Sequence, residues 1–119
     1  MSRPALKKKN RPVKTLPFGA LELVAARFKM LAEPMRLRLL NEMRGGEKTV
    51  TELVEATGAG QANVSKHLGL LADAGMVSRR KEGLNVNYFI NDESLFELCD
   101  LVCGRIQKEL AEKAAHFGG

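Results

Sequence analysis

The chain has 119 residues, which suits a single small domain, and a net charge of +5 that comes from its first 16 residues. Hydrophobic residues make up 45% of it, enough for a single core, while aromatic residues make up only 5%. It has no apolar run that could span a membrane and no signal peptide, so we expect a cytoplasmic protein without a membrane partner. Phosphate-binding loops, nucleophile elbows and metal-hydrolase spacings are also missing, so we do not expect an enzyme.

Residues 1–18 are interpreted as a flexible basic arm that precedes a folded domain over residues 19–117. The first 16 residues hold six basic side chains and no acidic one, whereas the rest of the chain holds 13 basic and 14 acidic ones. Pro4, Pro12 and Pro17 prevent a long helix, and the segment has little to bury. Such an arm either follows a nucleic-acid backbone without sequence preference or only adds solubility.

Two amphipathic helices should follow the arm. The first ends near Ala32, and the second has Pro34 in its first turn and stops at Gly45-Gly46. The apolar positions of the first recur at helical spacing, at Leu21, Val24, Ala25, Phe28 and Leu31. Those expected to face the core from the second are Leu37, Leu40 and Met43.

A short third helix should begin at about Val50, because Thr49 and Glu52 have the spacing of a capping box. Gly58-Ala59-Gly60 supplies the permissive backbone that ends this helix and turns the chain into the next one. The apolar face of this helix is expected at Leu53, Val54 and Ala56.

The fourth helix should run from about Gln61 to Ala74, before Gly75 stops it. Val64, Leu68 and Leu71 make its buried stripe. The opposite face is polar or small, with Ala62, Lys66, Gly69 and Asp73 at its centre and Asn63 and Ser65 at its flanks.

This polar face is a candidate for contact with DNA. Amide and hydroxyl groups near a helix N-terminus can reach base edges, and a lysine can neutralise a phosphate. The plainer alternative for such a face is simple solvation, and His67 either packs at the edge of the core or reaches a phosphate. The candidate contacts are Gln61, Asn63, Ser65, Lys66 and His67.

A β-hairpin should follow the fourth helix. Residues Met76 to Lys81 and Val86 to Ile90 are of strand type, and Glu82-Gly83-Leu84-Asn85 forms the turn between them. The basic run is expected at the tip, where a wing would lie along the sugar-phosphate backbone, although a charge run is often only a solvated surface. The candidate contacts of this wing are Arg79, Arg80, Lys81 and Asn85.

A last helix should begin near Asn91-Asp92, which are good N-caps. Its apolar stripe suits packing against another helix, and Gly104 within it would permit a close helix crossing. The stripe comprises Leu95, Cys99, Val102, Ile106 and Leu110.

The succession of these motifs resembles the ArsR/SmtB family of bacterial winged-helix repressors. The residues that carry the resemblance are Phe28–Leu40, Gln61–Leu68, Leu70–Val77 and Arg80–Gly83, and it extends over roughly Leu21 to Leu110. It implies a mainly α winged helix-turn-helix with a small β-hairpin, in the order α-α-α-α-β-β-α. It also implies a homodimer through the first and last helices that represses transcription by binding an inverted repeat in double-stranded DNA. The alternatives are control by a protein partner or another ligand, and a protein-interaction module.

Cys99 and Cys103 are the candidate sensor residues, because a spacing of four places both thiols on one helical face. No cofactor is required for the fold, but thiolates bind As(III) and other soft metal ions well, and a thiol oxidant is a further candidate inducer. The alternative is that both cysteines are small apolar residues that only pack. A disulfide between them would strain the helix.

Two familiar metal sites of the resembled family are not matched. The helix Val50 to Thr57 lacks the cysteine box, and Asp92 aligns with a ligand while Ser94 and Arg105 stand where further ligands are expected. His116 is too far along the last helix to join Cys103 in a local cluster. A zinc sensor is therefore disfavoured, while a metalloid or redox sensor remains.

Overall fold

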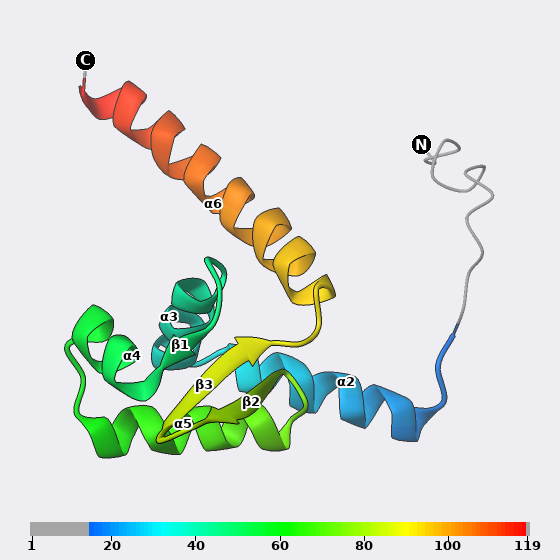
Figure 1. The fold of residues 1–119 in the computed structure, drawn as a ribbon. Coiled ribbons are helices and arrows are strands. Elements are labelled where there is room, and N and C mark those ends of the chain that lie inside the picture. The colour runs from blue at the N-terminus through cyan, green and yellow to red at the C-terminus, as the bar shows by residue number, and fades with distance from the viewer. Residues whose placement is uncertain (1–14, 119) are drawn as a thin grey trace.

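The structure, a computed structural model, describes residues 15–118. Over this range the chain forms five helices and a three-stranded antiparallel sheet (Figure 1). The basic side chains of the expected arm, from Arg3 to Lys14, lie outside the described residues. The elements are α2 (Phe18–Leu31), α3 (Pro34–Met43), β1 (Lys48–Thr49), α4 (Val50–Thr57), α5 (Gln61–Asp73), β2 (Val77–Glu82), β3 (Asn85–Ile90) and α6 (Ser94–Gly118).

The helix-turn-helix of α4 and α5 begins at the capping box that the sequence predicts. Thr49 Oγ1 accepts a hydrogen bond from Glu52 N at 3.1 Å, and Glu52 Oε1 accepts one from Thr49 N at 2.8 Å. Gly58 ends α4 with a φ of 73°, a left-handed conformation that glycine adopts without strain. The expected start of this helix and its turn are confirmed.

The core lies where α3, α4 and α5 pack against the sheet. Val64, Leu68 and Leu71 of α5 are fully buried, as their spacing predicts. Two expected positions are wrong: Leu37 is 42% exposed while Leu39 is buried, and Ala56 is exposed while Thr57 is buried. The remaining buried hydrophobic residues are Leu40, Met43, Leu53, Met76, Val77, Tyr88 and Leu95.

Substitution of Leu68 by alanine should lower the free energy of unfolding by about 2–5 kcal/mol, because it leaves a cavity beneath the helix-turn-helix. Thermal unfolding followed by circular dichroism measures this. Leu84→Ala is the matched control, because Leu84 is 101% exposed and should lose nothing. Equal melting temperatures for the two variants would contradict this packing.

The sheet has the strand order β1-β3-β2, with β3 paired to both neighbours. The short strand β1 was not predicted, because two residues are too few to show an alternating pattern; it pairs Lys48 with Tyr88 and Thr49 with Asn87. The hairpin turn is also shorter than expected, since Glu82 pairs with Asn85. The basic residues 79–81 therefore lie within β2, and Leu84 occupies the tip.

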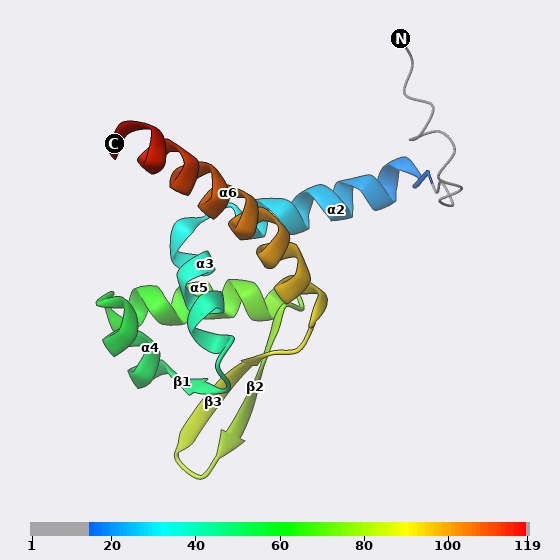
Figure 2. The ribbon, with the colours of Figure 1, turned by 90° about the horizontal axis from the view of Figure 1, so that it is seen from above.

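Helices α2 and α6 project from this body in different directions (Figures 1 and 2). Neither helix buries its apolar face against the core. No residue of α2 is buried, and α6 is exposed along residues 100–116. Their large exposed hydrophobic residues are Phe18, Leu21, Leu23, Val24, Phe28, Leu101, Val102, Ile106 and Leu110. Apolar surface of this extent on two helices indicates an interaction face.

Candidate nucleic-acid interface and thiol site

Helix α5 presents a polar face on the side opposite its buried stripe. Gln61, Asn63, Ser65 and Lys66 are exposed within the first two turns of the helix. Gly60 precedes them as the N-cap and makes no side-chain cap, so the positive end of the helix dipole is left open. The face thus offers amide, hydroxyl, ammonium and backbone N–H groups to an anionic partner.

His67 lies apart from these four residues. It is 7% exposed, and its Nδ1 lies 3.2 Å from Nη1 of Arg36 on α3. Because a guanidinium can only donate, the His67 ring must accept at Nδ1 in this arrangement. This favours the packing alternative for His67 over a contact with a phosphate.

Arg36, on α3, forms hydrogen bonds that connect α2, α3 and α5. Its Nε donates to the Met30 carbonyl oxygen at 2.7 Å near the end of α2, while its backbone N donates to Glu33 Oε1 at 3.1 Å. The same side chain reaches His67 in α5. Arg36 therefore holds the first apolar helix at a fixed place relative to the polar face of α5.

Arg36→Ala should lower the free energy of unfolding by about 1–3 kcal/mol, because it leaves His67 Nδ1 and the Met30 carbonyl without this donor. Urea unfolding with a linear extrapolation measures the change. Glu55→Ala, on the exposed surface of α4, serves as the control. Identical unfolding midpoints for the three proteins would show that Arg36 does not fasten these elements.

The basic residues of the hairpin fall on two faces of the sheet. Arg79 and Lys81 are exposed and share one face with Tyr88 and Val86, their cross-strand partners. Arg80 lies on the other face, where its Nη2 pairs with Glu47 Oε1 and its Nη1 with Glu82 Oε2 at 3.4 Å. The positive charge of Arg80 is thus partly neutralised within the protein.

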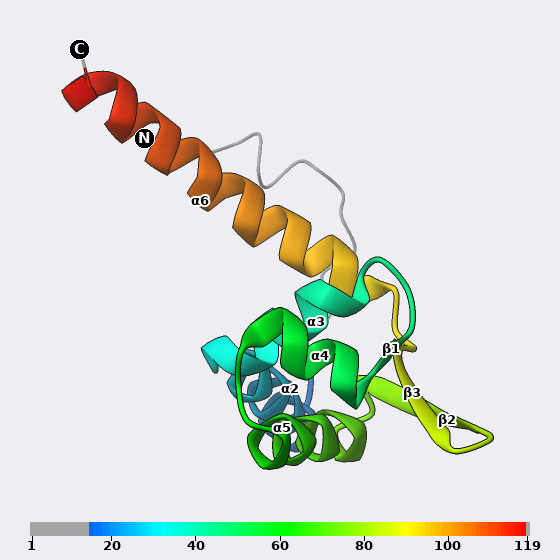
Figure 3. The ribbon, with the colours of Figure 1, turned by 60° about the vertical axis from the view of Figure 1, so that its left-hand side comes forward.

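Helix α5 and the hairpin lie on the side of the body away from α6 (Figure 3). Arg79, Lys81 and Val86 line a hollow beside β2, and Asn85 is exposed at the start of β3. A duplex laid against α5 would meet this wing along its backbone. All the predicted contacts except His67 therefore occupy exposed positions. Among them, Arg80 already forms ion pairs with Glu47 and Glu82.

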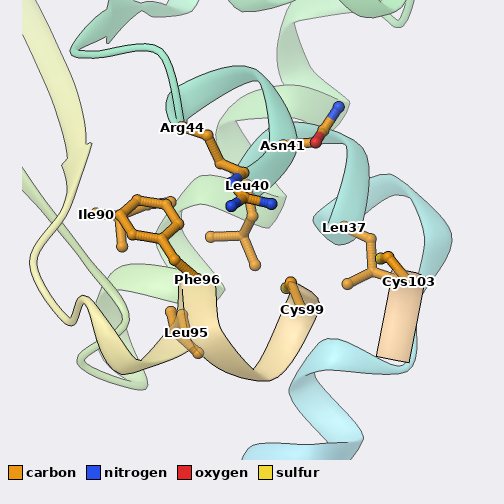
Figure 4. Close-up of a pocket in the computed structure, with 9 residues that line it drawn as sticks. All are labelled: Leu37, Leu40, Asn41, Arg44, Ile90, Leu95, Phe96, Cys99 and Cys103. Carbon is orange, nitrogen blue, oxygen red and sulfur yellow. The ribbon is translucent and has the colours of Figure 1, made fainter. Parts of the chain in front are cut away.

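The two thiols lie near the root of α6, where this helix passes α3. Cys99 is partly buried and Cys103 is exposed, and both face an apolar cavity of about 300 Å³ (Figure 4). Burial raises the pKa of the Cys99 thiol, the neighbouring Cys103 and Asp100 raise it further, and Arg44 opposes them. Cys99 is therefore a neutral thiol at neutral pH and a poor nucleophile.

Residues 15–118 of a single chain contain no site that could bind a metal ion through three or more side chains. No group of three histidine, cysteine, aspartate or glutamate side chains is placed to hold one there. Asp92, which aligns with a ligand of the resembled family, instead accepts hydrogen bonds from Ser94 N at 3.0 Å and Ser94 Oγ at 2.6 Å. These hydrogen bonds lower the pKa of Asp92 and start α6.

One contact near the thiols was not foreseen from the sequence. Arg44, at the end of α3, forms an ion pair with Asp100 at 2.8 Å and lies 5.1 Å from the ring centre of Phe96. Both partners belong to α6, so Arg44 connects the root of this helix to the body. Sequence spacing gave no signal for it, because more than fifty residues separate the partners.

The chain resembles curated regulators over most of its length. It is 36% identical over 92 residues to the transcriptional regulator NmtR of Mycobacterium tuberculosis, covering 77% of each chain. It is 42% identical over 71 residues to a protein of Streptomyces lividans described as a "probable mercury resistance operon repressor", covering 60% of this chain and 57% of that protein.

Solved structures show the same fold. The homodimeric winged helix-turn-helix DNA-binding domain Mb0332 of Mycobacterium bovis is 32% identical with a TM-score of 0.72, over 79% of this chain and 87% of that one. The antimony-specific transcriptional repressor AntR is 32% identical with a TM-score of 0.71, over 90% and 94%.

No described helix is both long and apolar enough to cross a membrane.

Residues 33–79 match the family model for bacterial regulatory proteins of the arsR family, which confirms the expectation of a regulator rather than an enzyme. Together with the extended identity to NmtR, this match shows that the chain belongs to the ArsR family of winged helix-turn-helix transcriptional regulators.

Proposed function

We propose that this protein is a dimeric transcriptional repressor that binds an inverted repeat in double-stranded DNA. The observation that carries the proposal is the polar N-terminal half of α5, exposed directly opposite a fully buried stripe. Gln61, Asn63 and Ser65 read base edges in the major groove, while Lys66 neutralises a phosphate. Arg79, Lys81 and Asn85 of the wing contact the backbone or minor groove, and Arg80 joins them where a phosphate displaces its carboxylate partners.

Helices α2 and α6 form the dimer interface in this proposal. Val102, Ile106 and Leu110 recur every four residues of α6 and are 49–59% exposed in the single chain. This stripe needs a partner of similar length and character, and a second copy of the chain supplies one. The similar domain Mb0332, which is homodimeric, supports this choice.

An inducer that binds Cys99 and Cys103 releases the repressor from DNA. Among the candidate inducers, As(III) or another soft metal ion fits these thiols best. Both thiols lie on one face of α6 beside the contact with α3, so their ligand would alter the helix that dimerises. The relatives named for mercury and antimony support a soft ligand. A thiol oxidant acting at the same pair is the alternative inducer.

Fluorescence anisotropy of the reduced protein on a labelled fragment of its own upstream promoter tests the proposal. Titration with arsenite, cadmium, zinc and peroxide, beside a Cys99→Ser/Cys103→Ser variant, identifies the inducer class. We expect tight, salt-sensitive binding that a thiophilic agent reverses in the parent protein only. Binding no tighter than to an unrelated duplex would contradict the DNA-binding claim, and release that persists in the variant would contradict the thiol claim.

A further inference from the structure

The β2–β3 hairpin divides its basic side chains between the two faces of the sheet. Arg79 and Lys81 share the face of Val77 and Tyr88, both of which are buried in the core. Arg80 projects from the opposite face. Among the described residues, no carboxylate pairs with Arg79 or Lys81, whereas two carboxylates pair with Arg80. The wing therefore contains one basic residue whose charge is already engaged within the protein.

Glu47 is the main partner of the Arg80 guanidinium. Nη2 of Arg80 pairs with Glu47 Oε1, while Nη1 lies 3.4 Å from Glu82 Oε2. The hydrogen bond to Glu47 is also the largest cause of the raised pKa of Arg80, ahead of the charge of Glu82. Glu82 is itself engaged elsewhere, because Asn87 Nδ2 donates to its Oε1 at 3.2 Å. Two carboxylates and one guanidinium leave this group of side chains with a net charge of −1.

The register of the sheet brings Glu47 to Arg80. Asn87 of β3 pairs with Arg80 of β2 on one side and with Thr49 of β1 on the other. Side chains alternate along a strand, so Glu47, two residues before Thr49, is expected on the same face as Arg80. Since β3 lies between β1 and β2, the ion pair spans all three strands. The carboxylate therefore reaches the wing from outside the hairpin.

A DNA phosphate can compete with Glu47 for the same donors. The side chains of Arg80 and Glu47 are 48% and 39% exposed, so solvent reaches both. Ion pairs at this degree of exposure are weak. A guanidinium also donates to phosphate oxygens in the same forked geometry that it uses for a carboxylate. An anion of the DNA backbone can thus replace Glu47, but only by breaking an existing ion pair.

We propose that Glu47 is an autoinhibitory residue, an internal mimic of a DNA phosphate that competes with DNA for Arg80. In the free protein the carboxylate occupies the guanidinium. In the complex a backbone phosphate takes its place, and the free energy of the broken ion pair is subtracted from the binding free energy. Part of the affinity that the wing could supply is thereby withheld, which favours release of the DNA. The inference rests on the proposed function, because it assumes that the wing lies along a duplex.

A double-mutant cycle of Glu47→Gln and Arg80→Ala tests the inference. Anisotropy titrations of the reduced full chain measure each variant on the promoter fragment and on an unrelated duplex. Glutamine keeps the size of the side chain and removes its charge. Glu47→Gln should tighten binding at least about threefold, because the weak ion pair no longer competes with the phosphate. In an Arg80→Ala background the same change should alter the affinity less than about 1.5-fold, because no guanidinium is released.

Glu97→Gln is the matched control, because it removes the same charge from an exposed position near the start of α6. Its affinity should stay within about 1.5-fold of the parent protein, since salt screens distant exposed charges. Equal tightening by Glu47→Gln in both backgrounds would mean that Glu47 acts only as a general charge near the DNA. Unchanged or weaker binding by Glu47→Gln in the parent background would mean that Glu47 does not compete for Arg80. Either result would overturn the inference.

The two duplexes separate this inference from the proposed function. Phosphate contacts carry no sequence information, so the cycle can be read on either duplex. A parent protein that binds both duplexes equally would contradict the proposed operator recognition, while the cycle would still report on Glu47. A parent protein that prefers the promoter, together with a cycle that shows no coupling between Glu47 and Arg80, would overturn the autoinhibition alone.

Discussion

Replacing Asn63 and Lys66 together with alanine should weaken promoter binding at least about 100-fold, because each subunit of the dimer loses a base contact worth about 1–3 kcal/mol and a phosphate contact as well. Both side chains are exposed on α5, and neither packs in the core, so the fold should be retained. The single Lys66→Ala variant should also show a shallower salt dependence, since each subunit releases one counterion fewer. Anisotropy titrations at several salt concentrations measure both effects.

Lys108→Ala provides the matched control for this variant. It removes the same charge from an exposed position in the C-terminal half of α6, a helix that points away from α5 (Figure 1). We expect its promoter affinity to stay within about twofold of the parent protein, which corresponds to less than 0.5 kcal/mol. If the α5 variant retains parental affinity and salt dependence, α5 does not read the DNA.

Replacing Ile106 and Leu110 with glutamate should convert the protein to a monomer and weaken binding to the full inverted repeat by at least about 100-fold. Two charges placed in the apolar stripe of α6 would have to be buried without partners at the interface. A monomer binds each half-site independently, so the gain from linked half-sites is lost. Analytical ultracentrifugation gives the oligomeric state, and anisotropy gives the affinity.

Lys108→Glu is the control here, because residue 108 lies on the face of α6 turned away from Ile106 and Leu110. It alters charge on the same helix and should leave the oligomeric state unchanged. A sedimentation coefficient for the double variant equal to that of the parent protein would mean that this stripe is not the dimer interface.

Local patterns predicted the helix-turn-helix well. The capping box at Thr49 and Glu52 and the spacing of Val64, Leu68 and Leu71 are written in neighbouring residues, and the structure confirms both. The second helix was predicted less accurately, because the run Leu37 to Leu40 contains three leucines and permits two apolar stripes. In the folded chain Leu39 packs in the core, whereas Leu37 lines the apolar cavity beside Cys99 and Cys103.

Contacts between segments that are distant in the chain could not be predicted from the sequence. Neither the burial of His67 against Arg36 nor the pairing of Arg80 with Glu47 follows from periodicity, because each depends on how separate elements meet. The spacing of Cys99 and Cys103 did predict a shared helical face. The apolar cavity beside them could not be predicted, since residues of α3 and β3, distant in the sequence, line it together with α6.

Hydroxyl-radical footprinting of the reduced protein on its upstream promoter tests the central claim most directly. A dimer that inserts two α5 helices into the major groove should protect two half-sites on one face of the duplex. Their centres should lie about one helical turn, or 34 Å, apart, and their sequences should form an inverted repeat. Protection of a single half-site, or uniform weak protection along the fragment, would contradict a dimeric repressor that reads DNA through α5.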